Sequence, residues 1–246
     1  MKRLSYIVYL AIGCVLLSVL LYGIDYLIFR DAHTLFLYLM SSLAFLPLEI
    51  LIVVLIIERI IDQSERKAKL QKMNMVAGAF FSEAGNYLLR DMLDDFDNKA
   101  EISKWLNVKE SWGKKEFRDA VAYADHLKIE IDHHNMNLIG LKEFLSGKRD
   151  FIMTLLGNPS LLEHDRFTDL LWAVTHLDEE LESRTSFDNL PEADLKHLAG
   201  DIQRLYDNLA SEWLDYVQHI QTNYRFLYSL ILRTHPFQEK PSAVIK

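Results

Sequence analysis

Two long apolar stretches near the N-terminus constrain this chain more than any other feature of its sequence. Residues 6–29 contain a single charged side chain, Asp25, and residues 35–57 also contain only one. A helix of about 20 apolar residues crosses the hydrocarbon core of a bilayer, so each stretch is long enough to be a transmembrane helix. Only the short polar segment 30–34 separates them. We therefore predict that residues 1–58 form an antiparallel transmembrane hairpin.

Basic residues on either side of the two stretches predict how the hairpin is oriented. Lys2 and Arg3 precede the first stretch, and only Arg30 lies in the turn. Five more follow the second stretch: Arg59, Arg66, Lys67, Lys69 and Lys72. Because short loops rich in Lys and Arg stay in the cytoplasm, both termini are expected there. Anionic headgroups attract the same side chains, so residues 59–72 are interpreted as a basic juxtamembrane neck.

A cleaved signal peptide is the alternative interpretation of the first stretch. The stretch is longer than the apolar core of a signal peptide, and no Ala-x-Ala site follows it. The segment from Ala11 to Cys14 resembles a lipoprotein cleavage site, but few apolar residues precede it and many follow. We therefore expect a retained helix. Because Cys14 is the single cysteine, a disulfide within the chain and zinc sites built on several thiolates are excluded.

The remainder of the chain has the composition of an acidic helical domain. Residues 73–246 carry 19 Lys and Arg against 29 Asp and Glu, and such a surface repels nucleic acids. From residue 73 onward apolar side chains recur at i, i+3, i+4 and i+7, which indicates amphipathic helices. We predict an all-α protein with a cytoplasmic helical bundle at 73–235 and a C-terminal tail at 236–246.

Turn-forming residues divide this domain into expected helices. No proline occurs between Leu48 and Asn158, so the second transmembrane helix is expected to continue into the first helix of the domain. The later helices are expected at 101–108, at 114–145, at 165–184 and from Pro191 to about 232, where His235-Pro236 stops the chain's helical run.

Three small residues suggest a place of close packing. Gly78, Ser82 and Gly85 are spaced at i, i+4 and i+7, so they fall on one face of a regular helix. Small side chains let the backbone of another helix approach closely. We expect this face to pack against a neighbouring helix.

Glu49 is the most informative single residue. A carboxylate inside a membrane span costs a few kcal/mol, so it usually faces protein or water and marks a pathway or a partner. Pro47 just before it frees a backbone carbonyl and can kink the helix. Two interpretations stay open. A ring of Glu49 side chains lines an ion path in an oligomer, or a protonated or hydrogen-bonded Glu49 holds the helices together.

Histidines and carboxylates also recur at helical spacing in the domain. Glu130-x-x-His133 has the spacing of a di-iron ligand pair, but the full pattern needs a second Glu-x-x-His, and the nearest match is Asp194-x-x-His197. Ordinary salt bridges therefore remain the simpler interpretation, and no metal site is favoured. If a metal is bound, the candidate ligands are His126, Glu130, His133, His176, Glu180, Asp194 and His197.

No catalytic motif names a reaction. The sequence has no P-loop, no Gly-x-Gly-x-x-Gly, no Gly-x-Ser-x-Gly and no His-Glu-x-x-His. Three segments carry a resemblance instead: Leu48-Glu49 through Glu58-Arg59, Asn74 to Gly85 (NMVAGAFFSEAG) and Asp169 to Leu177 (DLLWAVTHL). In these segments the chain resembles an uncharacterised group of prokaryotic two-span membrane proteins. The resemblance implies a multi-pass protein of a prokaryotic inner (cell) membrane and no particular activity.

These observations lead to one main hypothesis and two alternatives. The main hypothesis is a membrane-anchored protein without catalytic activity or cofactor, whose helical domain senses a signal or interacts with a protein partner or with its own copies. The first alternative is a small oligomeric ion channel or transport component that uses Glu49. The second is a membrane-tethered metal-binding helical bundle. The expected partners are the lipid bilayer and further copies of the chain, and not nucleic acid.

Overall fold

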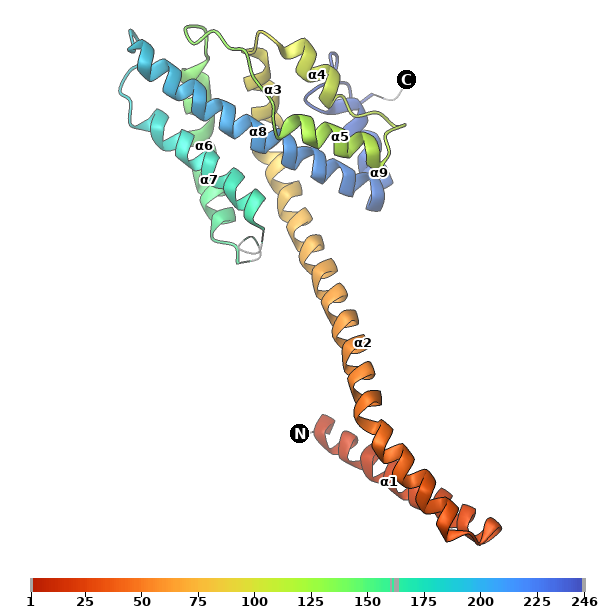
Figure 1. The fold of residues 1–246 in the computed structure, drawn as a ribbon. Coiled ribbons are helices and arrows are strands. Elements are labelled where there is room, and N and C mark those ends of the chain that lie inside the picture. The colour runs from red at the N-terminus through yellow and green to blue at the C-terminus, as the bar shows by residue number, and fades with distance from the viewer. Residues whose placement is uncertain (1, 160, 162–163, 245–246) are drawn as a thin grey trace. The chain divides into compact units, whose positions relative to one another are not determined.

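The computed structural model describes residues 2–159, 161 and 164–244, and it confirms the all-α fold (Figure 1). The chain divides into two compact units, Met1–Arg66 and Lys67–Lys246. Within the described residues no strand forms, and the one β-type contact is an isolated antiparallel bridge between Phe96 and Ile131.

The first unit contains two apolar helices that reverse direction at a tight turn. Helix α1 is Lys2–Phe29 and helix α2 begins at Ala32. Arg30 has a φ of 49°, in the left-handed region that ends many helices. The carboxylate of Asp31 then accepts hydrogen bonds from the backbone N–H groups of His33 (3.1 Å) and Thr34 (3.2 Å), and so caps the N-terminus of α2.

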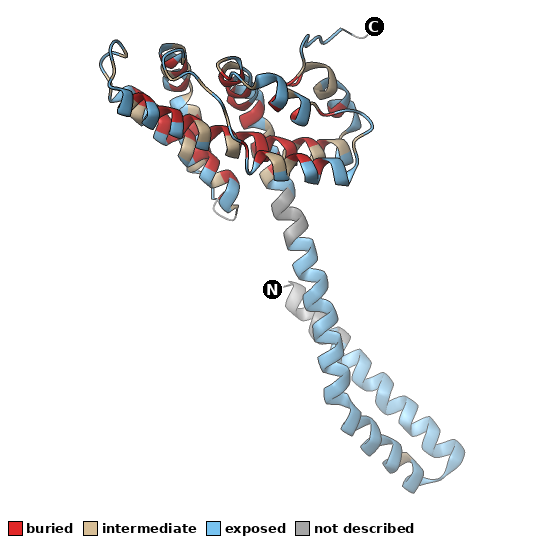
Figure 2. Ribbon diagram, turned by 45° about the horizontal axis from the view of Figure 1, so that its top comes forward, coloured by how far each residue is buried: buried red, intermediate tan, exposed pale blue. Residues whose placement is uncertain are grey.

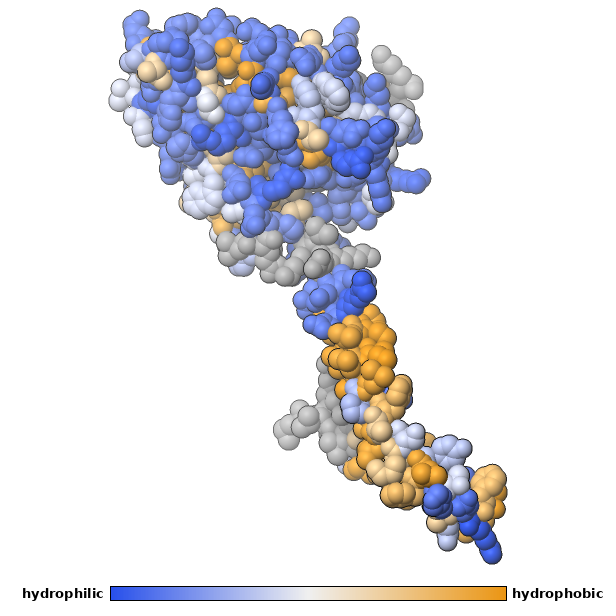
Figure 3. All heavy atoms as spheres, in the orientation of Figure 1, coloured by the Kyte–Doolittle hydropathy of each residue, from blue (hydrophilic) through white to orange (hydrophobic). Residues whose placement is uncertain are grey.

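The apolar side chains of this unit are not covered by protein. Among the described side chains of residues 9–65, all are exposed except that of Leu35, which is half-buried (Figure 2). Apolar side chains accordingly form most of the visible surface of this unit in Figure 3, whereas the visible surface of the domain is largely hydrophilic. Two helical segments are long enough and apolar enough to cross a membrane, Ala11–Phe29 and Ala32–Glu65.

As expected from the lack of proline, the second apolar helix continues into the first helix of the domain. Helix α2 is Ala32–Phe80, and it is followed by a π-helical segment, η1 (Phe81–Gly85), and by α3 (Asn86–Asp94). A π-turn holds more residues than an α-turn, so it rotates the residues after it around the helix axis. The regular spacing on which the shared face of Gly78, Ser82 and Gly85 depended is therefore interrupted.

The expected helix at 114–145 is wrong, because the structure has two helices with a loop between them. Helix α4 is Lys99–Leu106, α5 is Lys114–Ala124 and α6 is Leu138–Leu156. In the loop 125–137, side chains from elsewhere hold the backbone. Asn98 bonds to the Lys128 carbonyl (2.8 Å) and the Glu130 N–H (3.0 Å), and Gln203 bonds to the Ile129 N–H (2.8 Å) and the Leu127 carbonyl (2.8 Å).

The last expected helix is also divided. Helix α7 is Asp165–Glu182, α8 is Glu192–Asn223 and α9 is Arg225–Thr234. Tyr224, with φ −139° and ψ 66°, breaks the helix between α8 and α9. The break redirects α9 so that Tyr228 is buried and its hydroxyl donates to the Lys109 carbonyl (2.9 Å). His235 follows the end of α9, where the sequence predicts a stop.

Helix α8 is the central element of the domain. It contacts α3, η1, α5, α7 and α9, and α6 packs against α7. Its apolar side chains are almost all buried, whereas the apolar side chains described for α1 are exposed (Figure 2). The largest of them are Trp213 and Tyr206, at 1% and 0% exposure, and the Trp213 indole donates to Asn86 (3.1 Å). This packing fixes the polar side chains at the two ends of α8.

Candidate functional site

The first set of candidate metal ligands is not assembled as the sequence suggested. His126, Glu130 and His133 lie in the loop 125–137, so they share no helix face, and the helical spacing assumed for them is wrong. His133 instead lies 4.0 Å from a carboxylate oxygen of Glu192 at the start of α8.

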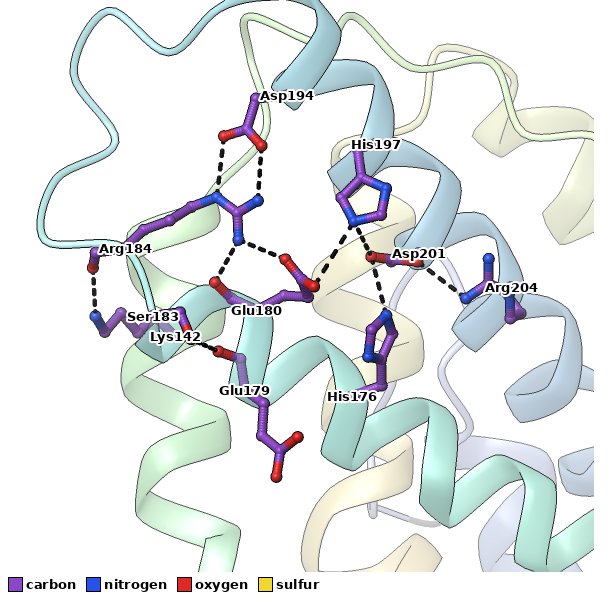
Figure 4. A network of polar contacts seen from close by, with 10 residues as sticks. All are labelled: Lys142, His176, Glu179, Glu180, Ser183, Arg184, Asp194, His197, Asp201 and Arg204. Atoms are coloured by element: carbon purple, nitrogen blue, oxygen red, sulfur yellow. Dashed lines mark hydrogen bonds and ion pairs between the residues drawn. The ribbon is translucent and has the colours of Figure 1, made fainter.

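The other four candidates do gather, in a polar network between α7 and α8 (Figure 4). His176 and Glu180 come from α7, and Asp194 and His197 come from α8. His197 Nε2 lies 3.7 Å from Glu180 Oε1 and 3.4 Å from Asp201 Oδ2. We call these residues, together with Asp201, Arg184 and Arg204, the α7–α8 network.

Asp201 is the buried centre of this network. Its side chain is 2% exposed, and it lies between two imidazoles, with His176 Nε2 at 3.5 Å and His197 Nε2 at 3.4 Å from the same oxygen, Oδ2 (Figure 4). Its other oxygen, Oδ1, accepts a hydrogen bond from Arg204 (3.0 Å). Asp201 follows Asp194 and His197 at helical spacing, i, i+3 and i+7, on α8.

Arg184 ties the other end of the network together. Its guanidinium makes two hydrogen bonds to Asp194, at 2.7 and 3.0 Å, and one to Glu180 Oε2 at 2.8 Å. The hydrogen bonds from Arg184 hold the pKa values of both carboxyl groups below their ordinary values. Such a bidentate pair joins the end of α7 to the start of α8.

The network has the properties of a structural cross-link. In the part of the chain that the structure describes, no three His, Cys, Asp or Glu side chains are grouped so as to hold a metal ion. The imidazoles of His176 and His197 lie within ion-pair distance of Asp201. Through its ion pairs the network joins α7 to α8.

A second polar site is a pocket of about 720 Å³ between α2, α5, α7 and α8. Its volume falls in the usual range for small-molecule sites. We call it the Arg166 pocket, and it is lined by Met73, Asn74, Lys114, His164, Asp165, Arg166, Phe167, Glu212, Asp215, Gln218, His219, Thr222 and Asn223.

At the wall of this pocket one guanidinium faces three carboxylates. Arg166 Nε lies 3.3 Å from Glu212, and its two terminal nitrogens lie 3.2 Å from Asp215 and 3.1 Å from Asp125. Ser211 also contacts Arg166, and its hydroxyl donates to Asp125 (2.6 Å). The group carries more negative than positive charge when all its members are ionised.

Burial changes the protonation of these groups. It raises the pKa of Glu212 to about 7, and the charge of Arg166 only partly opposes this. Burial also raises the pKa of Asp215, and it lowers the pKa of His219. Titratable groups with shifted pKa values in a pocket are typical of functional sites. Of the carboxyl groups around Arg166, that of Glu212 therefore holds a proton more readily than an exposed glutamate does.

Ser211, which contacts Arg166, is closed off from the pocket. Ser211 is 1% exposed and its hydroxyl is already bonded to Asp125, so no substrate can reach it. The three nitrogens of Arg166 each face a carboxylate.

Only part of this pocket can be recognised from the sequence. Glu212 and His219 have the spacing of one helix face, but Arg166 and Asp125 lie far from them along the chain. The face formed by Glu212, Asp215 and His219 at i, i+3 and i+7 was the available signal.

The remaining candidates lie elsewhere. Glu49 is exposed on α2 and forms no hydrogen bond or ion pair with the described residues. Gly78 is half-buried, and a Cβ there would lie 3.4 Å from the Tyr216 ring of α8. Ser82 is exposed. Gly85 is buried, but a Cβ there would meet the rings of Phe81 (2.5 Å) and Phe80 (2.9 Å) of its own turn, so another helix backbone is not what crowds it.

The fold and its polar clusters define an all-helical protein with two apolar N-terminal helices and a helical domain. The chain belongs to the family of the uncharacterised protein MJ1433. The family's N-terminal helical domain matches residues 2–61, and its C-terminal helical domain matches residues 69–233. The uncharacterised protein MJ1433 of Methanocaldococcus jannaschii is 40% identical over 240 residues, which are 98% of this chain and 96% of that protein. No solved structure matches the chain.

Proposed function

We propose that the chain is an integral membrane protein whose helical domain binds a signal or a partner without catalysis. The observation that carries the anchoring is the complete exposure of the described apolar side chains of Ala11–Phe29. In water such a surface is costly, at about 25 cal/mol for each Å² left uncovered. A lipid bilayer covers it at no such cost.

The proposed orientation places both termini in the cytoplasm of a prokaryotic cell. Its support is the excess of Lys and Arg in residues 2–3 and 59–72 over the single Arg30 of the turn. The acidic domain is then cytoplasmic, and residues 59–72 lie next to anionic headgroups.

The proposed binding role of the domain is supported by the Arg166 pocket. The pocket is large enough for a small molecule, and Glu212 in it titrates near neutral pH. A ligand that changes the charge around Glu212 changes the protonation of that carboxyl group. Because protonation is linked to folding, ligand binding would then change the stability of the domain.

Glu49 supports a second candidate, a small oligomeric channel or transport component. A carboxylate within an apolar stretch that has no partner among the described residues is stabilised when further copies surround it. An oligomer that placed Glu49 around an axis would give a negatively charged path for cations.

Fractionation tests the anchoring. The full chain is expected to stay in the membrane pellet after alkaline carbonate extraction, which removes peripheral proteins. A chain that lacks residues 1–58 is the control, and it is expected in the soluble fraction. Release of the full chain by carbonate would contradict the proposal.

Two substitutions of Glu49 separate its roles. Glu49→Gln keeps shape and hydrogen bonding, whereas Glu49→Leu removes both. If Glu49 joins helices, the Gln variant assembles and the Leu variant does not. If it conducts, both variants lose cation flux in liposomes while the Gln variant still assembles. A Leu variant that assembles normally, together with a wild type that shows no flux, would exclude both roles.

A further inference from the structure

Another pocket lies where α8 ends and α9 begins, and its lining carries a charge opposite to that of the Arg166 pocket. Its volume is about 800 Å³. We call it the Arg225 pocket, and its walls include Trp112, Gln221, Arg225, Tyr228, Ser229 and Arg233. Glu110 is the one carboxylate among the lining residues that the structure describes, so two guanidinium groups share the pocket with a single negative charge. Thr222 is the one described lining residue that the two pockets have in common.

The guanidinium of Arg225 is open to a ligand. Its side chain is exposed, and within the described part of the chain it forms no hydrogen bond or ion pair. Every other arginine of residues 73–246 contacts a carboxylate or a backbone carbonyl. This contrast occurs in a domain where Asp and Glu outnumber Lys and Arg by 29 to 19. A ligand therefore reaches Arg225 without displacing an ion pair.

Arg233 supplies the second positive charge, and hydrogen bonds hold it in place. Arg225, Ser229 and Arg233 are spaced at i, i+4 and i+8, so they lie on one face of α9. Arg233 Nε donates to the Ser229 carbonyl (3.0 Å), and its Nη1 donates to the carbonyl of Ala243 in the C-terminal tail. Its Nη2 and the Ser229 hydroxyl form no hydrogen bond with the residues that the structure describes. The pocket therefore offers N–H and O–H donors beside two positive charges.

Hydrogen bonds also fix the aromatic wall of the pocket. Gln221 Nε2 donates to the Trp112 carbonyl (2.8 Å) and to the Tyr228 hydroxyl (3.2 Å). The Tyr228 hydroxyl in turn donates to the Lys109 carbonyl (2.9 Å). The segment before α5 is thereby joined to α8 and α9. The wall is formed before a ligand binds, as is usual for small-molecule sites.

We propose that the Arg225 pocket binds a small organic phosphate. A phosphate monoester carries close to two negative charges and three acceptor oxygens, which match two guanidinium groups and a hydroxyl. Arginine pairs with phosphate through two parallel hydrogen bonds. The phosphate pairs with Arg225, Arg233 adds the second positive charge, and the organic part lies against Trp112. The volume of the pocket falls in the usual range for such ligands.

The test compares phenyl phosphate with benzoate and phenol, which carry one charge and no charge on the same ring. Binding to the full chain in phosphatidylcholine nanodiscs is measured by ligand-detected NMR, with empty nanodiscs subtracted. One hydrogen bond to a charged group corresponds to about 10-fold in affinity. Phenyl phosphate is therefore expected to bind at least that much more tightly than phenol, and benzoate is expected to lie between them.

Three substitutions assign the binding to this pocket. Arg225→Gln is expected to weaken the binding of phenyl phosphate by about 10-fold or more. Arg118→Gln, at an exposed arginine on α5, is the matched control and is expected to bind like the wild type. Glu110→Gln removes the carboxylate that repels the phosphate, so it is expected to tighten binding by up to about 5-fold. Circular dichroism and thermal unfolding check that each variant is folded.

Native mass spectrometry separates two sources of the phosphate, a soluble compound and a lipid headgroup. Phosphatidylglycerol is added to the full chain in detergent. A headgroup site retains less of this lipid in Arg225→Gln than in the wild type, whereas a site for a soluble phosphate retains it equally in both, and either result supports the proposal. Phenyl phosphate that binds no better than phenol or benzoate, binding that survives Arg225→Gln, weaker binding by Glu110→Gln, or no binding at all would overturn it.

Discussion

The carboxylate of Glu212 lies 3.3 Å from the guanidinium of Arg166, yet its pKa is raised to about 7. Burial of the Glu212 side chain outweighs the attraction of the positive charge, and the charges of Asp215 and Asp125 act in the same direction as burial. One guanidinium shared by three carboxylates therefore leaves the most buried of them ready to hold a proton.

This relationship predicts how stability depends on pH. The ordinary pKa of glutamate is 4.5, so the folded state binds the proton of Glu212 more tightly than the unfolded state does. Its stabilising contribution is fully present below pH 4.5 and is lost as the pH rises through about 7. Glu212→Gln is expected to remove this loss. The difference in the free energy of unfolding between the wild type and the variant is therefore expected to change by up to ~3 kcal/mol between about pH 5 and pH 8.

Thermal unfolding of both proteins across this pH range checks the prediction. Glu143→Gln, at an exposed site on α6, is the control and is expected to follow the wild type. A Glu212→Gln curve parallel to that of the wild type would show that Glu212 is ionised throughout.

The α7–α8 network predicts a stability effect centred on Asp201. Asp201→Ala removes the partner shared by His176, His197 and Arg204, and is expected to lower the free energy of unfolding by about 1–3 kcal/mol. Asp119→Ala, at an exposed site on α5, is expected to change it by less than about 0.5 kcal/mol. Equal stabilities of the two variants would mean that the network contributes no cross-link.

The two glycines of the π-turn region are expected to behave differently. A methyl group at Gly85 would lie 2.5 Å from the Phe81 ring, so Gly85→Ala forces the core to shift and is expected to cost about 1–3 kcal/mol. Gly78→Ala meets Tyr216 at 3.4 Å and is expected to be tolerated. Thermal unfolding of the two variants measures the contrast, and a more stable Gly85→Ala protein would contradict it.

Local patterns in the sequence predicted the helices that are apolar on all sides and the amphipathic helices that bury one face. The apolar runs at 6–29 and 35–57 indicated two long helices, and the structure has them as α1 and the first part of α2. The apolar stripe from residue 73 was sufficient to predict an amphipathic helix, and His235-Pro236 was sufficient to predict the end of the last helix. Both signals depend only on neighbouring residues of the chain.

Features that depend on distant partners could not be predicted in this way. The loop 125–137 is held by Asn98 and Gln203, which a pattern confined to 114–145 does not include. The break at Tyr224 depends on the burial of Tyr228 against a loop more than 100 residues earlier. In the same way, Arg166 meets Glu212 only because α7 packs against α8.

The central claim is that α1 and α2 span the bilayer and leave the helical domain in the cytoplasm. Cysteine labelling in whole cells tests it directly, because the native Cys14 is the only cysteine to be removed. In a Cys14→Ser background, single cysteines are placed at His33, in the first turn of α2, and at Ser146, on α6 of the domain.

A membrane-impermeant maleimide is added to intact cells and then, in a second sample, to permeabilised cells. The account predicts that His33→Cys is labelled in intact cells and that Ser146→Cys is labelled only after permeabilisation. Labelling of Ser146→Cys in intact cells, or protection of His33→Cys there, would contradict it.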